Sequence, residues 1–324
     1  MVLAAGFDEL KTNQVRREGD GKEIVGGATL TRFFGVGGSS SPLPQAVLAR
    51  FDPGKVSRAH FHKVDQFQLV IGGKGTLGRH ALAPYCVHFS RAYTPYGPLV
   101  SDASSGMVLF TLRRHHDPGS QRLPDKYDIL KSVRARQPWQ LTREIHFPTF
   151  PPGPASAGMM LQAVPGMQDH NGLAAYTISM MPDSHARAPD PAHGGGQYLI
   201  VVEGSLLHDN RELKAWALLF IDSNEAPLQI HAGSRGLEAI ILNFPRPPTP
   251  AAAATKIVHA TPGFKTWQCM LCSFVYDEAA GLPAEGIAPG TRWKDVPESW
   301  NCPDCSASKG DFLMAEREQV GKTV

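Results

Sequence analysis

One stretch of the sequence occurs twice: Gln66-Phe-Gln-Leu-Val-Ile-Gly-Gly73 returns 131 residues later as Gln197-Tyr-Leu-Ile-Val-Val-Glu-Gly204. A second pair of segments, residues 106–112 and 236–242, keeps nearly the same offset, at 130 residues. All four are strand-length runs rich in β-branched and aromatic residues, bounded by glycine, with little helical periodicity around them. We therefore predict a mainly β fold with two modules related by duplication.

Two proline-rich stretches, at 147–154 and 244–254, divide the chain of 324 residues. Such segments act as stiff connectors between folded units. The division predicts a first module over 1–146, a second over 155–243, a linker over 244–263 and a small C-terminal domain over 264–316. The 32 glycines and 27 prolines favour many short strands joined by turns.

Charge and hydropathy exclude several classes of protein. The 32 basic and 30 acidic residues leave a net charge of +2, without a basic block that would suit nucleic acid. The longest apolar runs, such as residues 215–221, fall far short of the roughly 20 residues of a membrane-spanning helix. Asp8 and Glu9 stand where a secretory signal would still be apolar. We expect a cytoplasmic protein that neither binds nucleic acid nor inserts into a membrane; a homo-oligomer stays open.

Four of the five cysteines form two Cys-x-x-Cys pairs near the C-terminus, Cys269 with Cys272 and Cys302 with Cys305. Two thiolates three residues apart hold one edge of a metal ion, and a second pair completes a tetrahedron that accepts zinc or iron. Disulfides fit less well in a cytosolic chain. The lone Cys86 is most simply a small apolar residue of a strand.

The sequence around these cysteines resembles the rubredoxins, and most closely those that serve alkane hydroxylases. The resemblance covers nearly all of 264–316, and its motifs are Cys269-Met-Leu-Cys272-Ser-Phe-Val-Tyr-Asp277, Gly286-Ile-Ala-Pro-Gly-Thr-Arg-Trp293, Val296-Pro-Glu-Ser-Trp-Asn-Cys-Pro-Asp-Cys305 and Lys309-Gly-Asp-Phe312. It implies one iron ion that is held by the four cysteines, cycles between ferric and ferrous, and receives electrons from a separate reductase. Structural zinc is the alternative, since either metal accepts four thiolates.

The first module carries a cluster of polar residues just before its repeated strand. Because side chains alternate along a strand, His60, His62, Gln66 and Gln68 share one face. The spacing Gly-x5-His-x-His-x3-Gln-x5-Gly, starting at Gly54, resembles the first motif of the cupins. With the duplication, the chain resembles a bicupin, which implies two tandem β-barrels that hold a metal ion between their strands.

The resemblance to the cupins leaves the ligand set of the first barrel incomplete. Gln66 stands where a cupin normally has Glu, and Tyr96 takes the place of the third His. We therefore predict a catalytic site around His60, His62, Gln66 and Tyr96. A mononuclear iron, manganese, copper or nickel ion would bind to His60 and His62, with His88 or His80 completing the set. Alternatively, His60 and His62 only form hydrogen bonds in the mouth of the barrel.

The second module lacks the equivalent residues. His193 matches His62 and Gln197 matches Gln66, but Pro191 stands at the position of His60 and cannot donate to a metal. His185, His208 and His231 lie nearby in the sequence, but we expect a degenerate scaffold that packs against the first module.

The charges of the two parts are opposite. Residues 264–316 contain four basic and eight acidic residues, a net charge of −4, which leaves +6 for the remainder. Such a division favours electrostatic docking of the C-terminal domain on the modules. The alternative is that these charges are simply solvated.

Two functions follow from these features. In the first, the chain is an oxidoreductase in which the C-terminal iron relays single electrons to a metal or substrate site in the first barrel, with oxygenase-type chemistry on a small molecule. In the second, the chain is an electron-transfer protein whose bicupin part is a non-catalytic binding scaffold, and it serves a separate oxygenase. A metal-free isomerase or sensor stabilised by zinc is a third reading. The sequence specifies neither the substrate nor the reaction.

Overall fold

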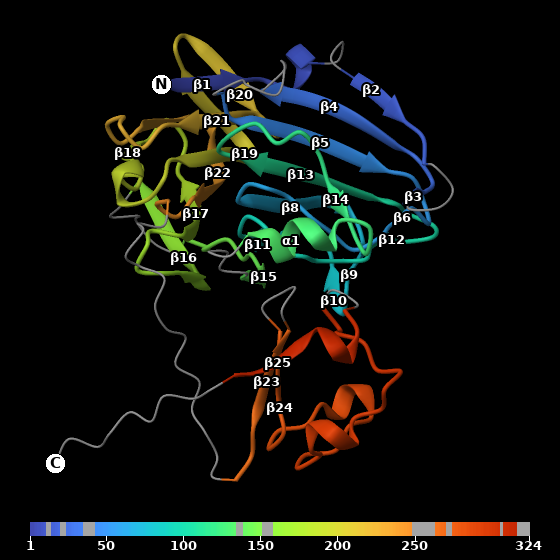
Figure 1. Ribbon diagram of the computed structural model, residues 1–324. Coiled ribbons are helices and arrows are strands. Elements are labelled where there is room, and N and C mark those ends of the chain that lie inside the picture. The colour runs from blue at the N-terminus through green and yellow to red at the C-terminus, as the bar shows by residue number, and fades with distance from the viewer. Residues whose placement is uncertain are drawn as a thin grey trace, which may run out of the picture.

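The computed structural model describes residues 1–10, 14–19, 24–34, 43–133, 139–150, 158–247, 263–269, 274–304 and 307–315. Cys272 and Cys305, much of the predicted linker and part of the first proline-rich stretch lie outside these residues. Two β modules lie side by side, and the small C-terminal domain, orange to red in Figure 1, lies against one end of them. No helix in the described ranges is long and apolar enough to cross a membrane.

The first module consists of two facing sheets and is a β-sandwich rather than a closed barrel. Its seven-stranded sheet runs in the order β15 (Gln140–Glu144), β11 (Cys86–Ser90), β8 (Gln66–Gly73), β13 (Met107–Arg113), β5 (Gln45–Phe51), β4 (Ala28–Phe34) and β2 (Gln14–Arg17). Its five-stranded sheet runs in the order β10 (His80–Leu82), β9 (Gly75–Leu77), β12 (Leu99–Ser101), β6 (Val56–Ser57) and β3 (Ile24–Val25). A short ribbon of β7 (His60–Phe61) and β14 (Gln121–Arg122), followed by helix α1 (Tyr127–Ser132), closes one end.

The second module is built on one eight-stranded sheet. Its main path is β1 (Val2–Ala5), β21 (Leu218–Ile221), β19 (Gln197–His208), β22 (Gln229–Asn243), β17 (Ala174–Met180) and β16 (Met159–Gln168), with β18 (His185–Arg187) on β22 and β20 (Arg211–Lys214) on β19. Strand β1 pairs with β21 although it begins the chain, so the N-terminal segment completes the sheet of the second module. The 3₁₀ helices of the two modules are η1 (Phe7–Leu10) and η2 (Pro191–His193).

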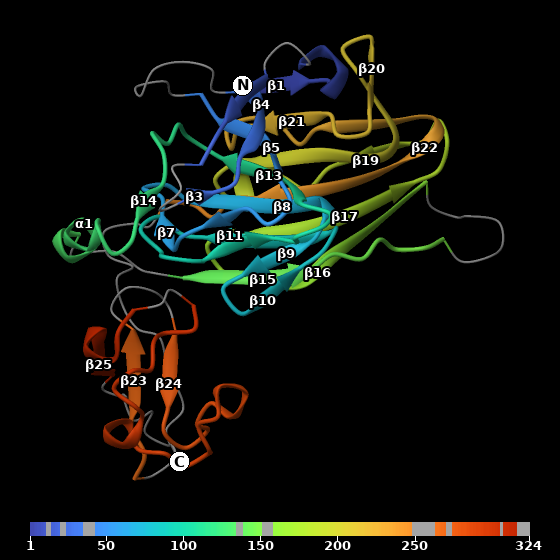
Figure 2. The ribbon, with the colours of Figure 1, turned by 90° about the vertical axis from the view of Figure 1, so that its right-hand side faces the viewer.

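One hydrophobic core joins the two modules. It contains Phe67 and Phe110 of the first and Tyr198 and Phe244 of the second, all fully buried. The ring centroids of Phe67 and Phe244 lie 4.9 Å apart in an edge-to-face contact. Figure 2 shows the sheets of the two modules stacked against each other. The second module therefore packs against the first, as the duplication predicts.

The repeated segments occupy equivalent places in the two sheets. Gly73 pairs with Met107 in the first, and Gly204 pairs with Leu237 in the second. The two glycines have φ angles of +63° and +69°, a conformation that side chains disfavour. A Cβ atom on either would collide with a facing carbonyl oxygen, that of Gly106 or Gly236. The same local geometry thus keeps glycine at both positions, which supports the duplication.

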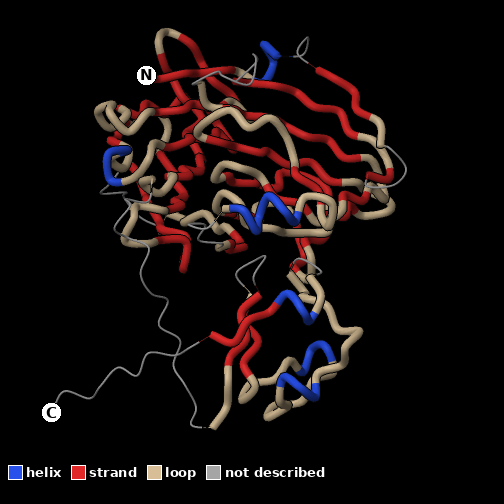
Figure 3. The backbone as a smooth tube through the Cα atoms, in the orientation of Figure 1, coloured by secondary structure: helices blue, strands red, loops and turns tan. Residues whose placement is uncertain are grey.

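The C-terminal domain has three strands around an aromatic core. The sheet order is β24 (Val275–Asp277), β23 (Thr266–Cys269) and β25 (Phe312–Ala315), with 3₁₀ helices η3 (Pro283–Glu285), η4 (Trp293–Asp295) and η5 (Lys309–Asp311) (Figure 3). Trp267 stacks on Trp293 with ring centroids 5.2 Å apart. Trp300 and Phe312 close the core. Aromatic packing of this density suits a domain too small for a large aliphatic core.

Candidate functional site

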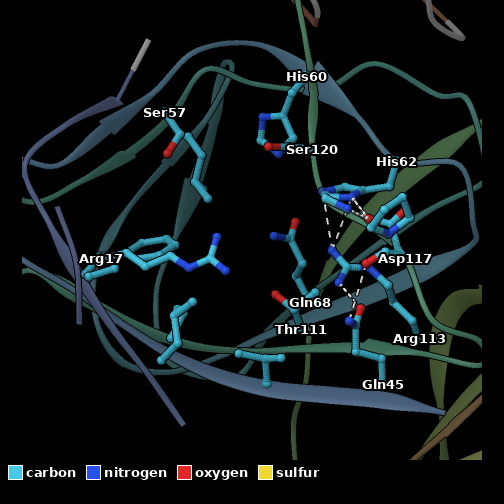
Figure 4. Close-up of a pocket in the computed structure, with 18 of the residues that line it drawn as sticks. Arg17, Gln45, Ser57, His60, His62, Gln68, Thr111, Arg113, Asp117 and Ser120 are labelled. Carbon is cyan, nitrogen blue, oxygen red and sulfur yellow. Dashed lines mark hydrogen bonds and ion pairs between the residues drawn. The ribbon is translucent and has the colours of Figure 1, made fainter. Parts of the chain in front are cut away.

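A polar cavity of about 330 Å³ opens inside the first module. Strands β5, β8 and β13 contribute one side of it, and the short ribbon of β7 and β14 contributes another. Figure 4 shows His60 and His62 on one side and Gln68 and Thr111 facing them. A cavity with convergent polar groups is the usual form of a small-molecule site.

His60 and His62 enter the cavity with one ring nitrogen of each already engaged. Nδ1 of His60 lies 2.8 Å from the Arg58 carbonyl oxygen, and Nδ1 of His62 lies 2.6 Å from Oδ2 of Asp117. Burial and the neighbouring His62 lower the pKa of His60 to about 3. Burial and the Arg113 charge lower the pKa of His62 to about 4, although Asp117 opposes the shift. Both rings are therefore neutral at pH 7, with Nδ1 donating. Nε2 of His60 is left as an acceptor, whereas Nε2 of His62 lies 3.3 Å from a terminal nitrogen of Arg113.

Gln66 and Tyr96 form a second part of the site. The Gln66 side chain donates to the Tyr96 hydroxyl, and both residues are buried. Burial raises the pKa of Tyr96 strongly, so the phenol stays protonated at neutral pH. Its ring lies close to those of His60 and His88, with centroid distances of 4.7 and 5.3 Å. The structure thus brings His60, His62, Gln66 and Tyr96 together, as the sequence predicts, while their catalytic role stays a prediction.

Two cavity residues were missed by the sequence reasoning. Arg113 ends β13, and its guanidinium donates from Nε to Gln66 at 3.1 Å and from one terminal nitrogen to Gln45 at 2.5 Å. Asp117, whose side chain is fully buried, accepts from His62 and from the backbone N–H groups of Lys63 and Gly119. A charged residue directly after the apolar run of residues 107–112 was the available signal for Arg113.

The third histidine, His88, pairs with Gln68 across β11 and β8, and the described residues do not group it with His60 and His62 as a metal site. His88 lies in β11, where Nδ1 is 2.9 Å from the Thr142 hydroxyl, and Nε2 is buried without a hydrogen-bond partner among the described residues. His80 lies in β10, near the C-terminal domain. Across the described ranges, no three His, Cys, Asp or Glu residues are placed to hold one metal ion. The described donors therefore do not complete a site for a second metal ion, and that ion stays a prediction.

In the second module, the predicted equivalents do not form a comparable site. Pro191 is buried at the start of η2, whereas His193 is exposed at its end. His185 and His231 pair across β18 and β22, with ring centroids 3.8 Å apart. A two-residue imidazole pair of this kind lacks the further ligands that a metal ion needs.

Cys269 and Cys302, the first cysteines of the two pairs, make equivalent backbone hydrogen bonds. The Cys269 N–H donates to the Phe274 carbonyl oxygen at 2.9 Å, and the Cys302 N–H donates to the Ala307 carbonyl oxygen at 2.7 Å. Each loop thus closes over five residues and contains one Cys-x-x-Cys pair. Cys269 and Cys302 are both buried within one cluster. This half of the donor set fits a thiolate-bound ion; Cys272 and Cys305 lie outside the described residues.

Residues 266–312 match a protein-family model described as Rubredoxin. Rubredoxin 4 of Rhodococcus sp. strain Q15 is 59% identical over 56 residues, which are 17% of this chain and 93% of that protein. Rubredoxin-1 of Alcanivorax borkumensis is 62% identical over 52 residues, which are 16% of this chain and 96% of that protein. The chain belongs to the rubredoxin family. The membership rests on its C-terminal part, here called the rubredoxin domain, and it implies an iron site and an electron-transfer role.

Solved structures also align with the N-terminal part of the chain. A bacterial pirin from Escherichia coli, determined in complex with nickel(II), aligns over 76% of this chain and 100% of its own, with a TM-score of 0.48 and 11% identity. Similarity of this degree transfers neither a metal nor an activity. The described strands themselves agree with the predicted class of two β modules followed by a rubredoxin domain.

The rubredoxin domain contacts the first module at the wall of the cavity. One hydrophobic cluster contains Phe61, Leu123 and Leu130 of the first module together with Cys269 and Cys302. Phe61 lies between the two cavity histidines in sequence, and alternation along the strand turns its side chain to the opposite face. The ribbon of β7 and β14 therefore has the cavity on one side and the cluster shared with the rubredoxin domain on the other.

Charged groups flank this apolar contact. Nε of Arg79, in the turn between β9 and β10, lies 3.2 Å from Oδ1 of Asp304, which follows Cys302 by two residues. The Arg79 guanidinium also lies over the ring of Phe274, 5.4 Å from its centroid. Basic residue and acidic domain thus meet as the charge division predicts, although the centre of the contact is apolar.

Proposed function

We propose that the chain is an oxidoreductase in which the rubredoxin domain passes single electrons to an acceptor bound in the first-module cavity, in an oxygenase-type reaction on a small molecule. The observation that carries the proposal is the common wall: the β7 and β14 ribbon presents His60 and Arg122 to the cavity and Phe61 to the cluster that contains Cys269 and Cys302. This arrangement supports the proposal, because the cysteine loops and the cavity lie on two sides of one ribbon.

The residues of the chain have distinct parts in this scheme. Cys269, Cys272, Cys302 and Cys305 would hold an iron ion, which would supply electrons to the acceptor one at a time. Phe61, Leu123 and the aromatic core keep water out of the contact. His60, which is neutral, provides a Nε2 acceptor for a proton of the bound molecule, while His62 is held between Asp117 and Arg113.

The number of electrons that the reaction consumes shows why a separate reductase is needed. Placing one atom of dioxygen in a substrate C–H bond and releasing the other atom as water consumes two electrons and two protons. A single iron centre carries one electron, so the rubredoxin domain must be reduced twice in each turnover. A separate reductase has to supply both electrons.

A second metal ion would supply the activation of dioxygen that such a reaction needs, but the described donors alone do not complete a site for it. The described donors lack a third ligand beside His60 and His62. In addition, one terminal nitrogen of Arg113 lies 3.3 Å from both ring nitrogens of His62, and a guanidinium at that distance repels a metal cation. Metal analysis tests this choice directly.

Electron carriage to a separate oxygenase is the second candidate function. It is favoured by the relatives, since the Rhodococcus and Alcanivorax rubredoxins are matched over almost their whole length and show the domain as a complete protein. In this scheme the two modules bind a molecule without transforming it.

One experiment separates the two functions. The full chain is reduced anaerobically and mixed with dioxygen and a panel of small molecules, while the thiolate-to-iron absorption reports reoxidation. We expect at least one compound to accelerate reoxidation in the wild type and to do so at least about tenfold less in His60→Ala with His62→Ala. His185→Ala with His231→Ala is the matched control in the second module.

Each result decides between the proposals. Compound-dependent reoxidation that survives the loss of His60 and His62 would exclude the cavity as the electron acceptor. If no compound changes the rate, electron carriage alone is left. Metal analysis runs in parallel, and a colourless chain that contains zinc would exclude both redox functions.

A further inference from the structure

We propose that the first-module cavity binds a small organic carboxylate, and that this anion is the substrate class of the reaction. The role of this anion as the substrate rests on the proposed function, whereas its binding does not.

The lining of the cavity has an excess of positive charge. Among the described residues that form it, five are cationic and two are anionic: Arg17, Arg32, Lys55, Arg113 and Arg122 against Glu18 and Asp117. Both carboxylates are already engaged. Glu18 pairs with Arg16, and Asp117 accepts hydrogen bonds from His62 and two backbone N–H groups. The lining therefore carries more positive than negative charge.

Arg113 is one of the two buried cations of this lining, with Lys55. It is only 8% exposed, and its guanidinium bonds to the amide oxygens of Gln66 and Gln45 and contacts the neutral His62 ring. No carboxylate of the described residues lies in ion-pair contact with it. Its direct hydrogen-bond partners are neutral, and the Asp117 carboxylate, which engages His62, acts on its charge without a direct ion pair. An anion in the cavity would compensate this buried charge directly.

Gln68 and Thr111 provide neutral polar groups beside this charge. They face each other across β8 and β13 and line the cavity, as Figure 4 shows. Gln68 is 7% exposed, and its amide hydrogen-bonds to none of the described residues. A buried amide without a partner is expected to find one in a ligand. A carboxylate can accept from both this amide and the Arg113 guanidinium.

The second module shows what the same frame looks like without this charge. Arg113 stands opposite Gln66, and Asn243 stands opposite Gln197 at the equivalent register. The Asn243 amide donates to the Gly172 carbonyl oxygen, within the protein. The shared strand pairing therefore does not require a cation at this position. Of the two equivalent positions, only that of the first module has one.

The size of the cavity sets a limit on the ligand. Ligand sites span about 300–1,000 Å³, and the volume of about 330 Å³ lies at the lower end. A carboxylate with one small ring fits such a space, whereas a cofactor of nucleotide size does not.

Calorimetric titration of the oxidised full chain tests the inference without any electron transfer. The probes are acetate with acetamide and benzoate with benzamide, which match in shape but differ in charge, and inorganic phosphate. We expect benzoate to bind at least about tenfold more tightly than benzamide, and Arg113→Gln to remove that preference. Arg50→Gln is the matched control, because Arg50 lies on β5 with its side chain outside the cavity.

The inference is overturned if the amides bind as tightly as the acids, if Arg113→Gln leaves benzoate binding unchanged, or if neither acid binds at millimolar concentration. Binding of phosphate alone would identify a phosphate site and also overturn it. The comparison of acid with amide in the wild type needs no variant, so it decides the question even if Arg113→Gln does not fold. Because the iron stays oxidised, a negative result leaves the electron relay untouched.

Discussion

The two modules share one arrangement of paired strands and differ in the side chains that fill its interior. In the first, Gln68 and Thr111 face each other across β8 and β13 at the floor of a cavity. In the second, the equivalent pair is Leu199 and Ile241, both buried in an apolar core. The strand pairing around the two pairs is the same. A few side chains therefore decide whether the interior between these strands is a polar cavity or an apolar core.

The ends of the same strands carry the second difference. The first module has His60 and Arg113, whereas the second has Pro191 and Asn243 at the matching positions. Proline lacks a side-chain donor and asparagine carries no charge. The second module thus lacks both the acceptor nitrogen and the cation. The proposed reaction therefore belongs to the first module.

The largest expected effect comes from giving the first module the interior of the second. Gln68→Leu with Thr111→Ile introduces the residues that Leu199 and Ile241 represent, with side chains of similar or slightly larger volume. We expect carboxylate binding to weaken at least about a hundredfold, because the cavity floor becomes apolar and fuller. The melting temperature should be equal or higher, since a buried amide without a partner is removed. Titration calorimetry and thermal unfolding measure the two effects.

A matched variant in the second module controls for general damage. Leu199→Val with Ile241→Val keeps that interior apolar and should leave carboxylate binding at the wild-type level while lowering stability. If filling the first module leaves binding intact, the ligand does not lie between β8 and β13, and the comparison of the two interiors says nothing about function.

Much of the architecture was accessible from the sequence because two signals were unusually strong. The repeat at nearly constant offset predicted the two modules, since equal registers require equal spacing of glycines such as Gly73 and Gly204. The paired cysteines and the aromatic residues around them predicted the rubredoxin domain, which the family match confirms. In both cases the spacing of residues along the sequence reflects the geometry of the backbone nearby.

Other features depend on contacts between distant segments and could not be predicted in this way. The pairing of β1 with β21 joins residues 2–5 to residues 218–221, and no short motif reports it. Arg113 meets His62 only because β13 lies beside the cavity wall. His88 was expected to complete the set of His60 and His62 from a nearby strand, and the folded chain places Tyr96 close to all three rings.

An intermediate effect tests whether the two frames are truly equivalent. Gly73→Ala and Gly204→Ala each place a side chain at positive φ and against a facing carbonyl oxygen. Each should lower the free energy of unfolding by about 1–3 kcal/mol, with similar values for the two because the geometry is the same. Chemical denaturation of the single variants measures this. A large loss at one glycine and none at the other would show that the two registers are not energetically equivalent.

The smallest effect concerns the turn that the rubredoxin domain covers in one module only. Arg79, after β9, pairs with Asp304, whereas the turn between β19 and β20 exposes Asp209 and Asn210. Because the Arg79 side chain is 42% exposed, Arg79→Gln should change the free energy of unfolding by less than about 1 kcal/mol. It should nevertheless slow compound-dependent reoxidation of the iron severalfold, and added salt should slow the wild type in the same way. Arg211→Gln, which removes a charge paired with Glu9 in the second module, is the control. Equal rates in the two variants would mean that the ion pair does not hold the rubredoxin domain in its electron-transfer position.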